Sequence, residues 1–284
     1  MIIVIQDRDD GMGHNNKSII ANKPKNYEVY KYPFRKNKII RLFTEIFHAI
    51  IISRKSKKIF FTNLKSECAF FLNFLKNKNI AGIYYHIEGK DYLNFLSNYK
   101  IFSTSKDTVN YIKKRGHKNV NLIYQGISSN FKFKDKKRDI DVLYVGTKTQ
   151  RKNWKHIKKV YDKIKKESNY NMVLQTNNNL SLKELSDLYQ RSKFLFFPTR
   201  LEGLGLPLIE ASFSGCNIIT SNLDHHRFIT LNQANYTDIN NSDFSYKLIK
   251  KLLKKYTGPD KNFYKNMKNK YSWKFFWRDI KNGY

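Results

Sequence analysis

Residues 194–221 constrain the fold of this chain more than any other segment. Phe194–Phe197 is an unbroken apolar run, which indicates a strand covered on both faces, and Pro198 ends it. Pro207 suits the first turn of a helix, which we expect to stop at Gly215 before a second strand at residues 217–220. A strand, a helix and a second strand in this order predict an α/β protein with a parallel sheet.

The same alternation of apolar runs and amphipathic segments continues along the whole chain. The 284 residues are enough for two domains of ordinary size. The lysine-rich segment 130–139 is the best boundary, and residues 140–145 begin a second α/β unit. We therefore predict an N-terminal domain over residues 1–132 and a C-terminal domain over residues 133–270. Residues 263–284 are expected to be helical, and their aromatic side chains predict core packing.

The loop within residues 194–221 carries two carboxylates and two glycines. Glu202 and Glu210 lie eight positions apart, and Gly203 and Gly205 allow backbone amides to approach a ligand closely. Free N–H groups at the start of the following helix favour an anion such as a diphosphate, and Glu210 can accept hydrogen bonds from a vicinal diol such as a ribose. Surface acids on an ordinary strand–helix–strand unit are the simpler alternative. The combination predicts a nucleotide site beyond the carboxyl ends of the strands.

Cations and a histidine follow other predicted strands. Arg151 and Lys152 lie in the loop after residues 140–145, where a cation can meet an anion, although surface lysines are common in this chain. His86 follows an expected strand at residues 80–85, and a purely structural histidine explains it equally well. A Gly-x-Gly ending at Gly13 follows the first expected strand, residues 2–5, and is consistent with a phosphate-binding loop or a plain turn.

The charge of the chain is extreme. Lys and Arg number 54 against 23 Asp and Glu, for a net charge of +31. A uniformly solvated basic surface explains this, as does an acidic partner: a membrane surface, a nucleic acid or the anionic substrate itself. Residues 39–52 have a helical apolar pattern, which we expect to face the core; contact with an anionic lipid surface is the alternative. The apolar positions are Ile39, Leu42, Phe43, Ile46, Phe47 and Ile50.

Cysteine use and the N-terminal residues suggest a compartment. Cys68 and Cys216 lie in separate apolar contexts, so we expect buried thiols rather than a disulfide or a metal pair. Residues 1–5 indicate a strand rather than a signal peptide, and no apolar run approaches the length of a membrane span. We therefore expect a cytoplasmic protein, either free or bound peripherally to a membrane.

Several of these segments together resemble the retaining glycosyltransferases of family 4, which have the GT-B fold. Glu202 to Glu210 resembles that family's Glu-x7-Glu signature, and Val145 to Asn153 resembles its Val-Gly-Arg-x-x-x-x-Lys-Gly/Asn loop. Residues 121–131 resemble the end of the family's N-terminal domain, residues 271–273 its Tyr/Phe-Ser-Trp opening of the final helix, and residues 84–86 the strand that presents a histidine to the donor sugar. The likeness covers nearly the whole chain and is strongest over residues 140–220.

This resemblance implies both a fold and an activity. The fold would be two Rossmann-like domains facing across a cleft, with a terminal helix, residues 271–284, packing back on the N-terminal domain. The activity would be transfer of a sugar from a nucleoside diphosphate sugar, UDP- or GDP-linked, to an acceptor hydroxyl with retention of configuration and without a metal or cofactor. Glu202, His86 and Lys152 would be catalytic. The donor would be bound by Glu210, Gly203, Leu204, Gly205, Leu206, Arg151, Thr147 and Gly13.

Two departures from the family pattern keep other functions open. The family's arginine after the glycine is Thr147 here, and its acid after residues 217–220 is missing, with Asp224 and His225 standing near that place. A non-catalytic protein that binds a nucleotide sugar or a nucleic acid is one alternative, and a glycosyltransferase acting on DNA is another; a nucleotide-sugar epimerase fits less well. The sequence does not indicate the acceptor, whether glycan, lipid-linked or protein.

Overall fold

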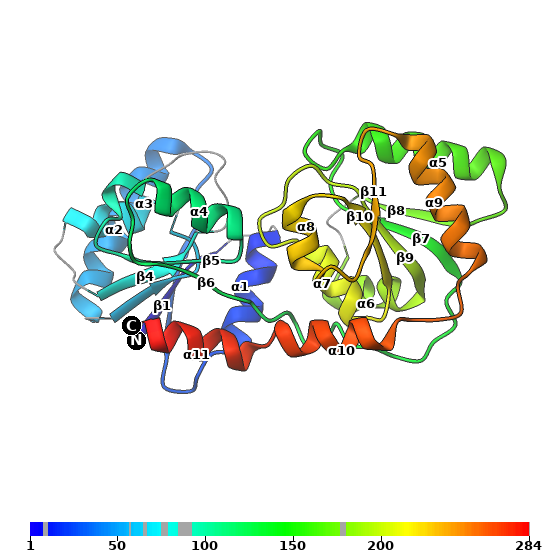
Figure 1. Ribbon diagram of the computed structural model, residues 1–284. Helices are drawn as coiled ribbons and strands as arrows, with labels where there is room; N and C mark the ends of the chain where they lie inside the picture. The colour runs from blue at the N-terminus through cyan, green and yellow to red at the C-terminus, as the bar shows by residue number, and fades with distance from the viewer. Residues whose placement is uncertain are drawn as a thin grey trace. The chain divides into compact units, whose positions relative to one another are not determined.

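The computed structural model describes residues 1–7, 11–56, 58–64, 67–74, 79–84, 93–176 and 180–283. The chain forms two compact units: unit 1 contains Met1–Gly126 and Trp273–Tyr284, and unit 2 contains Ile127–Ser272 (Figure 1). Each unit is a parallel sheet whose strands alternate with helices. The predicted α/β class with two Rossmann-like domains is therefore confirmed.

Unit 1 is built on a six-stranded sheet of order β2-β1-β3-β4-β5-β6, in which every neighbouring pair is parallel. A core cluster on one face of the sheet takes alternate strand residues such as Ile2, Val4 and Ile59, and it includes the buried thiol of Cys68, as expected. The elements are β1 (Ile2–Asp7), α1 (Gly11–Ala21), β2 (Glu28–Pro33), α2 (Lys38–Lys55), β3 (Lys58–Phe61), α3 (Glu67–Phe74), β4 (Asn79–Ile83), a 3-10 turn (Leu93–Phe95), β5 (Lys100–Ser103), α4 (Lys106–Lys114) and β6 (Val120–Leu122).

The last helix of the chain, α11 (Trp273–Gly283), belongs to unit 1. The Trp277 ring lies 5.7 Å from the Tyr27 ring and 6.0 Å from the Phe60 ring, centroid to centroid, so the predicted core packing is confirmed. Residues 263–284 are helical apart from a break at residues 271–272, because α10 (Lys261–Lys270) ends before Tyr271 and α11 begins at Trp273, where the family resemblance expects the final helix to open. The Tyr271 hydroxyl donates to the carbonyl of Ile229 in unit 2, which fixes the break where the chain passes from one unit to the other.

Two other expectations for unit 1 are corrected. Gly11 to His14 belong to α1 rather than to a loop, so Gly13 lies in the first turn of a helix. The helix expected over residues 39–52 is present as α2, but its apolar face is exposed, with Ile39, Phe43 and Phe47 more than half accessible. The residues that α2 buries are instead Glu45, Ala49 and Ile52.

Unit 2 is built on a five-stranded parallel sheet of order β11-β10-β9-β7-β8. Phe194–Phe197 are buried in its central strand, as their apolar run predicts, and Cys216 is also a buried free thiol. The elements are β7 (Ile140–Val145), α5 (Trp154–Glu167), β8 (Met172–Gln175), α6 (Leu182–Arg191), β9 (Ser192–Phe197), α7 (Leu206–Phe213), β10 (Asn217–Ser221), α8 (Asp224–Ile229), β11 (Asn235–Thr237), α9 (Ser242–Lys254) and α10.

The strand order of unit 2 reverses between β7 and β9. From β7 the chain crosses to β8 at one edge, and α6 then returns it to β9 on the opposite side of β7. The connections that leave β7 and β9 therefore diverge, and this topology predicts a ligand crevice beyond the carboxyl ends of these two strands. This is the place where an open α/β sheet binds ligands.

The segment that precedes β7 packs on unit 2. Arg138 donates to the carbonyls of Tyr189 and Ser214, and Gln190 donates to the carbonyl of Lys132 at 3.0 Å. Phe131 is buried and meets the Tyr189 ring edge-on. The lysine-rich segment therefore covers α6, and its lysines are largely exposed while its backbone is held by side chains from the helix.

Candidate functional site

A buried ion pair joins the loops that follow β7 and β9. The Lys152 ammonium Nζ lies 2.6 Å from Glu202 Oε1, and both side chains are about a tenth exposed or less. The parallel register of β7 and β9 explains the meeting, because neighbouring parallel strands end at the same edge of the sheet. Sequence reasoning selected both residues, and the structure brings them into direct contact.

The pair has a second cation beside it. Arg151 Nη1 lies 3.8 Å from Glu202 Oε2 and donates to the carbonyl of Leu201 at 3.1 Å. The backbone N–H of Arg200 in turn donates to the carbonyl of Arg151, so the two loops are joined by their main chains as well. The guanidinium is partly exposed, whereas the ammonium is not. The crevice therefore presents an accessible positive charge over a buried ion pair.

The main chain before α5 fixes the position of Lys152. Asn153 adopts left-handed φ/ψ of 59° and 39°, and its side-chain amide donates to the carbonyl of Ile239 at 2.9 Å. The Lys152 ammonium lies 4.9 Å from the centre of the Phe197 ring, at the end of β9. A cation over an aromatic face gains electrostatic attraction, so the Phe197 ring helps to hold the Lys152 ammonium in place.

Glu210 is a buried carboxylate on α7. The Tyr189 hydroxyl, from α6, donates to its Oε2 at 3.2 Å. Burial raises the pKa of Glu210 to about 7, and the hydrogen bond from Tyr189 opposes this rise only partly. Near neutral pH the carboxyl is therefore divided between its charged and neutral forms, and an added hydrogen-bond donor would favour the charged form.

The turn before α7 leaves main-chain donors without a side-chain cap. Gly205 is the N-cap with a left-handed φ of 68°, and no side chain caps the helix. The left-handed dihedral favours glycine, and a Cβ at this position would lie 2.7 Å from Ile229 Cδ1, so the end of that buried side chain would have to shift. Leu204 is buried, while Gly203 and Leu206 are half-buried. The geometry suits an anion near the helix start.

Two histidines of α8 lie under this region. His226 is fully buried, and its ring nitrogens lie 3.2 Å from the hydroxyls of Thr199, which follows β9, and Thr220, which lies within β10. Burial, then the neighbouring charges of His225 and Lys152, lower the pKa of His226 to about 3. His226 is therefore neutral at physiological pH and acts as a hydrogen-bonded support beneath the crevice. His225, which the sequence placed near the missing acid, is also buried.

The remaining predicted site residues are Thr147, Gly13 and His86. Thr147 is exposed at the start of the loop after β7, and its carbonyl accepts from the Tyr144 hydroxyl at 3.1 Å. Gly13 lies in unit 1, and His86 lies outside the described residues. Sequence reasoning missed Tyr189, because an aromatic residue at the apolar positions of an amphipathic helix predicts only core packing. Its partnership with Glu210 depends on how α6 packs against α7.

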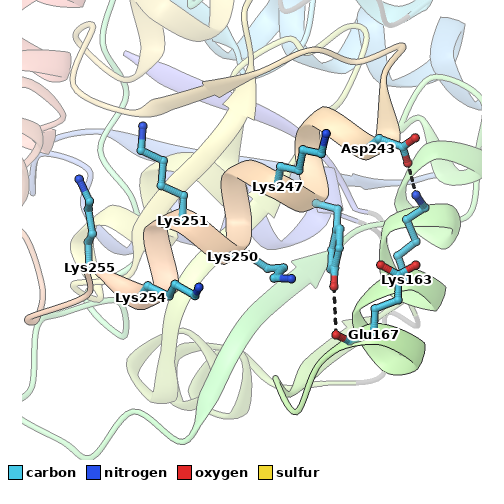
Figure 2. Close-up of a pocket in the computed structure, with 9 residues that line it drawn as sticks. Lys163, Glu167, Asp243, Lys247, Lys250, Lys251, Lys254 and Lys255 are labelled. Atoms are coloured by element: carbon cyan, nitrogen blue, oxygen red, sulfur yellow. Dashed lines mark hydrogen bonds and ion pairs between the residues drawn. The ribbon is translucent and has the colours of Figure 1, made fainter.

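Unit 2 has another concave surface, which is rich in lysine. A groove of about 560 Å³ lies between the end of α5 and α9, and Figure 2 shows the lysine side chains that line it. Lys163 pairs with Asp243, and the Tyr246 hydroxyl donates to the Glu167 carbonyl (Figure 2). None of the predicted site residues that the structure describes lines this groove. The remaining lining residues are Lys247, Lys250, Lys251, Lys254 and Lys255.

Comparison with known proteins agrees with this geometry. Residues 174–270 match the family model described as Glycosyl transferases group 1. This stretch, about a third of the chain, contains Tyr189, Glu202 and Glu210. The match therefore spans the part of unit 2 in which the structure has its buried acids. A comparison of the sequence with curated proteins finds no match.

Solved structures resemble the whole chain. Sucrose-phosphate synthase from Thermosynechococcus elongatus has a TM-score of 0.77 at 12% identity, over 99% of this chain and 97% of that one. HepE of Anabaena, solved in complex with UDP and glucose, has a TM-score of 0.76 at 10% identity, over 99% and 98%. WaaG, a glycosyltransferase involved in lipopolysaccharide biosynthesis, has a TM-score of 0.61 at 12% identity, over 95% and 94%. The fold is GT-B.

Proposed function

We propose that this protein transfers a sugar from a nucleoside diphosphate sugar to an acceptor hydroxyl, with retention of anomeric configuration and without a metal ion. The observation that carries the proposal is the buried Lys152–Glu202 pair at the switch point of unit 2, beside the glycine turn that leads to Glu210. The family match over residues 174–270 supports the reaction class. HepE was solved with UDP and glucose, which supports a nucleotide-linked donor.

In this proposal the cations receive the diphosphate. Arg151 is partly exposed and the Lys152 ammonium lies beneath it, so a phosphate entering the crevice meets two positive charges. The uncapped amides before α7 add donors from the other side. When the bond from the anomeric carbon to the diphosphate oxygen breaks, negative charge grows on that oxygen, and fixed positive groups lower the energy of that state. No metal is required for this step in the proposal.

The carboxylates hold the neutral parts of the donor. Glu210 accepts from the two hydroxyls of the ribose, and Glu202 with the amides of residues 203–206 orients the sugar. The acceptor oxygen forms the new bond to the anomeric carbon, and its proton passes to the departing phosphate oxygen. His86 is proposed to contact the sugar.

The first experiment is a panel of UDP-, GDP-, ADP- and dTDP-sugars tested without divalent metal. Thermal stabilisation by one nucleotide, together with slow release of its sugar, supports a transferase and names the donor. Glu210→Ala removes the stabilisation, and Glu167→Ala, an exposed glutamate on α5, serves as the matched control that keeps it. The configuration of the product at the anomeric carbon, followed by NMR, tests retention.

Two outcomes would overturn parts of the proposal. Binding without any hydrolysis or transfer would favour a non-catalytic nucleotide-sugar binding protein. If no donor binds and Glu210→Ala behaves as wild type, the site assignment is wrong. The nucleic-acid alternatives are then tested by the salt dependence of DNA binding.

A further inference from the structure

No element in the described part of the chain covers an apolar stripe on the outward face of α2. Ile39, Phe43 and Phe47 are 69%, 67% and 60% exposed, and Ile50 continues the stripe at 40%. These positions are separated by four, four and three residues, so they lie along one side of the helix. Ile40 and Leu42 widen the apolar face and are also exposed. Such large apolar side chains rarely gather on a surface unless they contact a partner.

The rotation of α2 is fixed by polar contacts on its opposite side. Glu45 is fully buried; its Oε1 accepts from the Gln6 amide at 2.6 Å, and its Oε2 accepts from the backbone N–H of Cys68 at 2.8 Å. His48 accepts or donates a 2.7 Å hydrogen bond with the Tyr30 hydroxyl. Turning the apolar stripe inward would remove Glu45 from these partners and expose Ala49 and Ile52. The outward stripe is therefore part of the folded state.

Positive charge lies at both ends of the stripe. Arg35, Lys36 and Lys38 are exposed before it, and Arg54 and Lys55 are exposed after it. Glu45 is the single acidic residue in residues 34–56, and it is buried on the other side of the helix. The exposed surface of α2 is therefore both apolar and cationic.

We propose that this face of α2 docks on an anionic lipid surface, with the helix lying in the plane of the interface. Apolar side chains enter the acyl boundary while flanking Lys and Arg side chains meet the headgroups, which is the arrangement of interfacial amphipathic helices. A second copy of the chain would bring two cationic faces together. A nucleic acid would engage the cations but leave the phenylalanines in water.

The lengths agree with docking on the surface of a bilayer. The 18 residues of α2 extend about 27 Å, and the apolar stripe covers most of this length. No helix in the described part of the chain is long and apolar enough to cross a membrane. The proposal is independent of the transferase assignment, because α2 contains none of the site residues.

Flotation with vesicles tests the proposal on the full chain. We expect binding to phosphatidylcholine vesicles that contain phosphatidylglycerol, and little binding to phosphatidylcholine alone. The variant F43S/F47S should lose at least about tenfold in partitioning, and K36E/R54E a similar factor, because each basic residue near an anionic surface contributes about fivefold. Both variants change exposed positions, so their melting temperatures should remain those of the wild type.

A matched control distinguishes the effect of the basic residues beside α2 from the effect of the net positive charge of the whole protein. K247E/K251E makes the same charge change on exposed lysines of α9 and should keep its partitioning within about twofold. Equal loss in this control, or wild-type binding by F43S/F47S, overturns the proposal. The proposal is also overturned if the wild-type protein does not bind vesicles and instead forms a concentration-dependent dimer that F43S/F47S abolishes. Donor hydrolysis in solution should be unchanged in F43S/F47S, which keeps this test separate from that of the transferase.

Discussion

Replacing Glu210 by glutamine is expected to stabilise the empty protein, and more so at high pH. The folded state holds this carboxyl at a pKa of about 7, against a usual value of 4.5. The folded state therefore binds the proton more tightly than the unfolded chain does, so the contribution of Glu210 to stability falls as the pH rises from 4.5 through 7. A glutamine at this position does not titrate and escapes this loss.

The magnitude follows from the two pKa values. Above both pKa values the ionised, buried carboxylate lowers stability by about 3.5 kcal/mol, since each unit of pKa difference corresponds to about 1.4 kcal/mol. At about pH 5.5 the folded carboxyl is mostly protonated and the cost is about 1.5 kcal/mol. The advantage of Glu210→Gln should therefore grow by about 2 kcal/mol between about pH 5.5 and about pH 8.

The assay is urea unfolding of wild type and Glu210→Gln at both pH values. The change between the two pH values is the informative quantity, because the fixed cost of an amide beside Tyr189 cancels. Glu167→Gln on the exposed face of α5 is the control and should show no growth with pH. If the advantage of Glu210→Gln is constant or shrinks as the pH rises, the carboxyl is not held in a desolvated site and the reasoning is refuted.

Three further outcomes are expected. Nucleotide binding should tighten as the pH rises through about 7, since a diol donates best to an ionised Glu210, and calorimetry in buffers of different ionisation enthalpy should detect proton release; pH-independent binding would exclude Glu210 from the contact. Lys152→Met and Glu202→Gln should each cost about 3–5 kcal/mol in urea unfolding, because each single change removes the nearest partner of a buried charge. The double variant should be at least about 2 kcal/mol more stable than the sum of the two single effects predicts; full additivity would mean that the two groups do not interact. Gly205→Ala should cost about 1–3 kcal/mol, from its left-handed φ and the contact with Ile229, whereas Gly116→Ala, also left-handed but with open space around it, should cost about 1 kcal/mol; equal costs would remove the packing argument.

Much of the fold follows from local patterns in the sequence. The apolar run Phe194–Phe197 predicts a strand buried on both faces, and this strand is the middle of the second sheet. Lys152 and Glu202 were selected independently, as residues that follow strands, and they meet because β7 and β9 are neighbours in parallel register. Residues that directly follow neighbouring parallel strands lie at the same edge of the sheet, so this part of the site was predictable from the sequence.

The inward face of α2 could not be predicted in the same way. Its apolar period is strong, and burial of the apolar face is the usual outcome. The orientation is decided instead by Glu45, whose partners Gln6 and Cys68 are 39 and 23 residues away in the chain. A contact at that separation leaves no periodic signal. Tyr189 was missed for the same reason, since its hydroxyl finds Glu210 only after α6 packs beside α7.

The burial of Glu210 and Lys152 links the stability of the empty protein to its affinity for the donor. Glu210 is held where its charge is disfavoured, and Lys152 is held by an acid of its own chain instead of by a ligand. A nucleoside diphosphate would supply donors to the first group and an anion beside the second, so binding would relieve the cost of the buried Glu210 charge. Glu210, which weakens the empty fold, is thus expected to contribute strongly to donor affinity. A variant that stabilises unit 2 at Glu210 should for that reason bind the nucleotide more weakly.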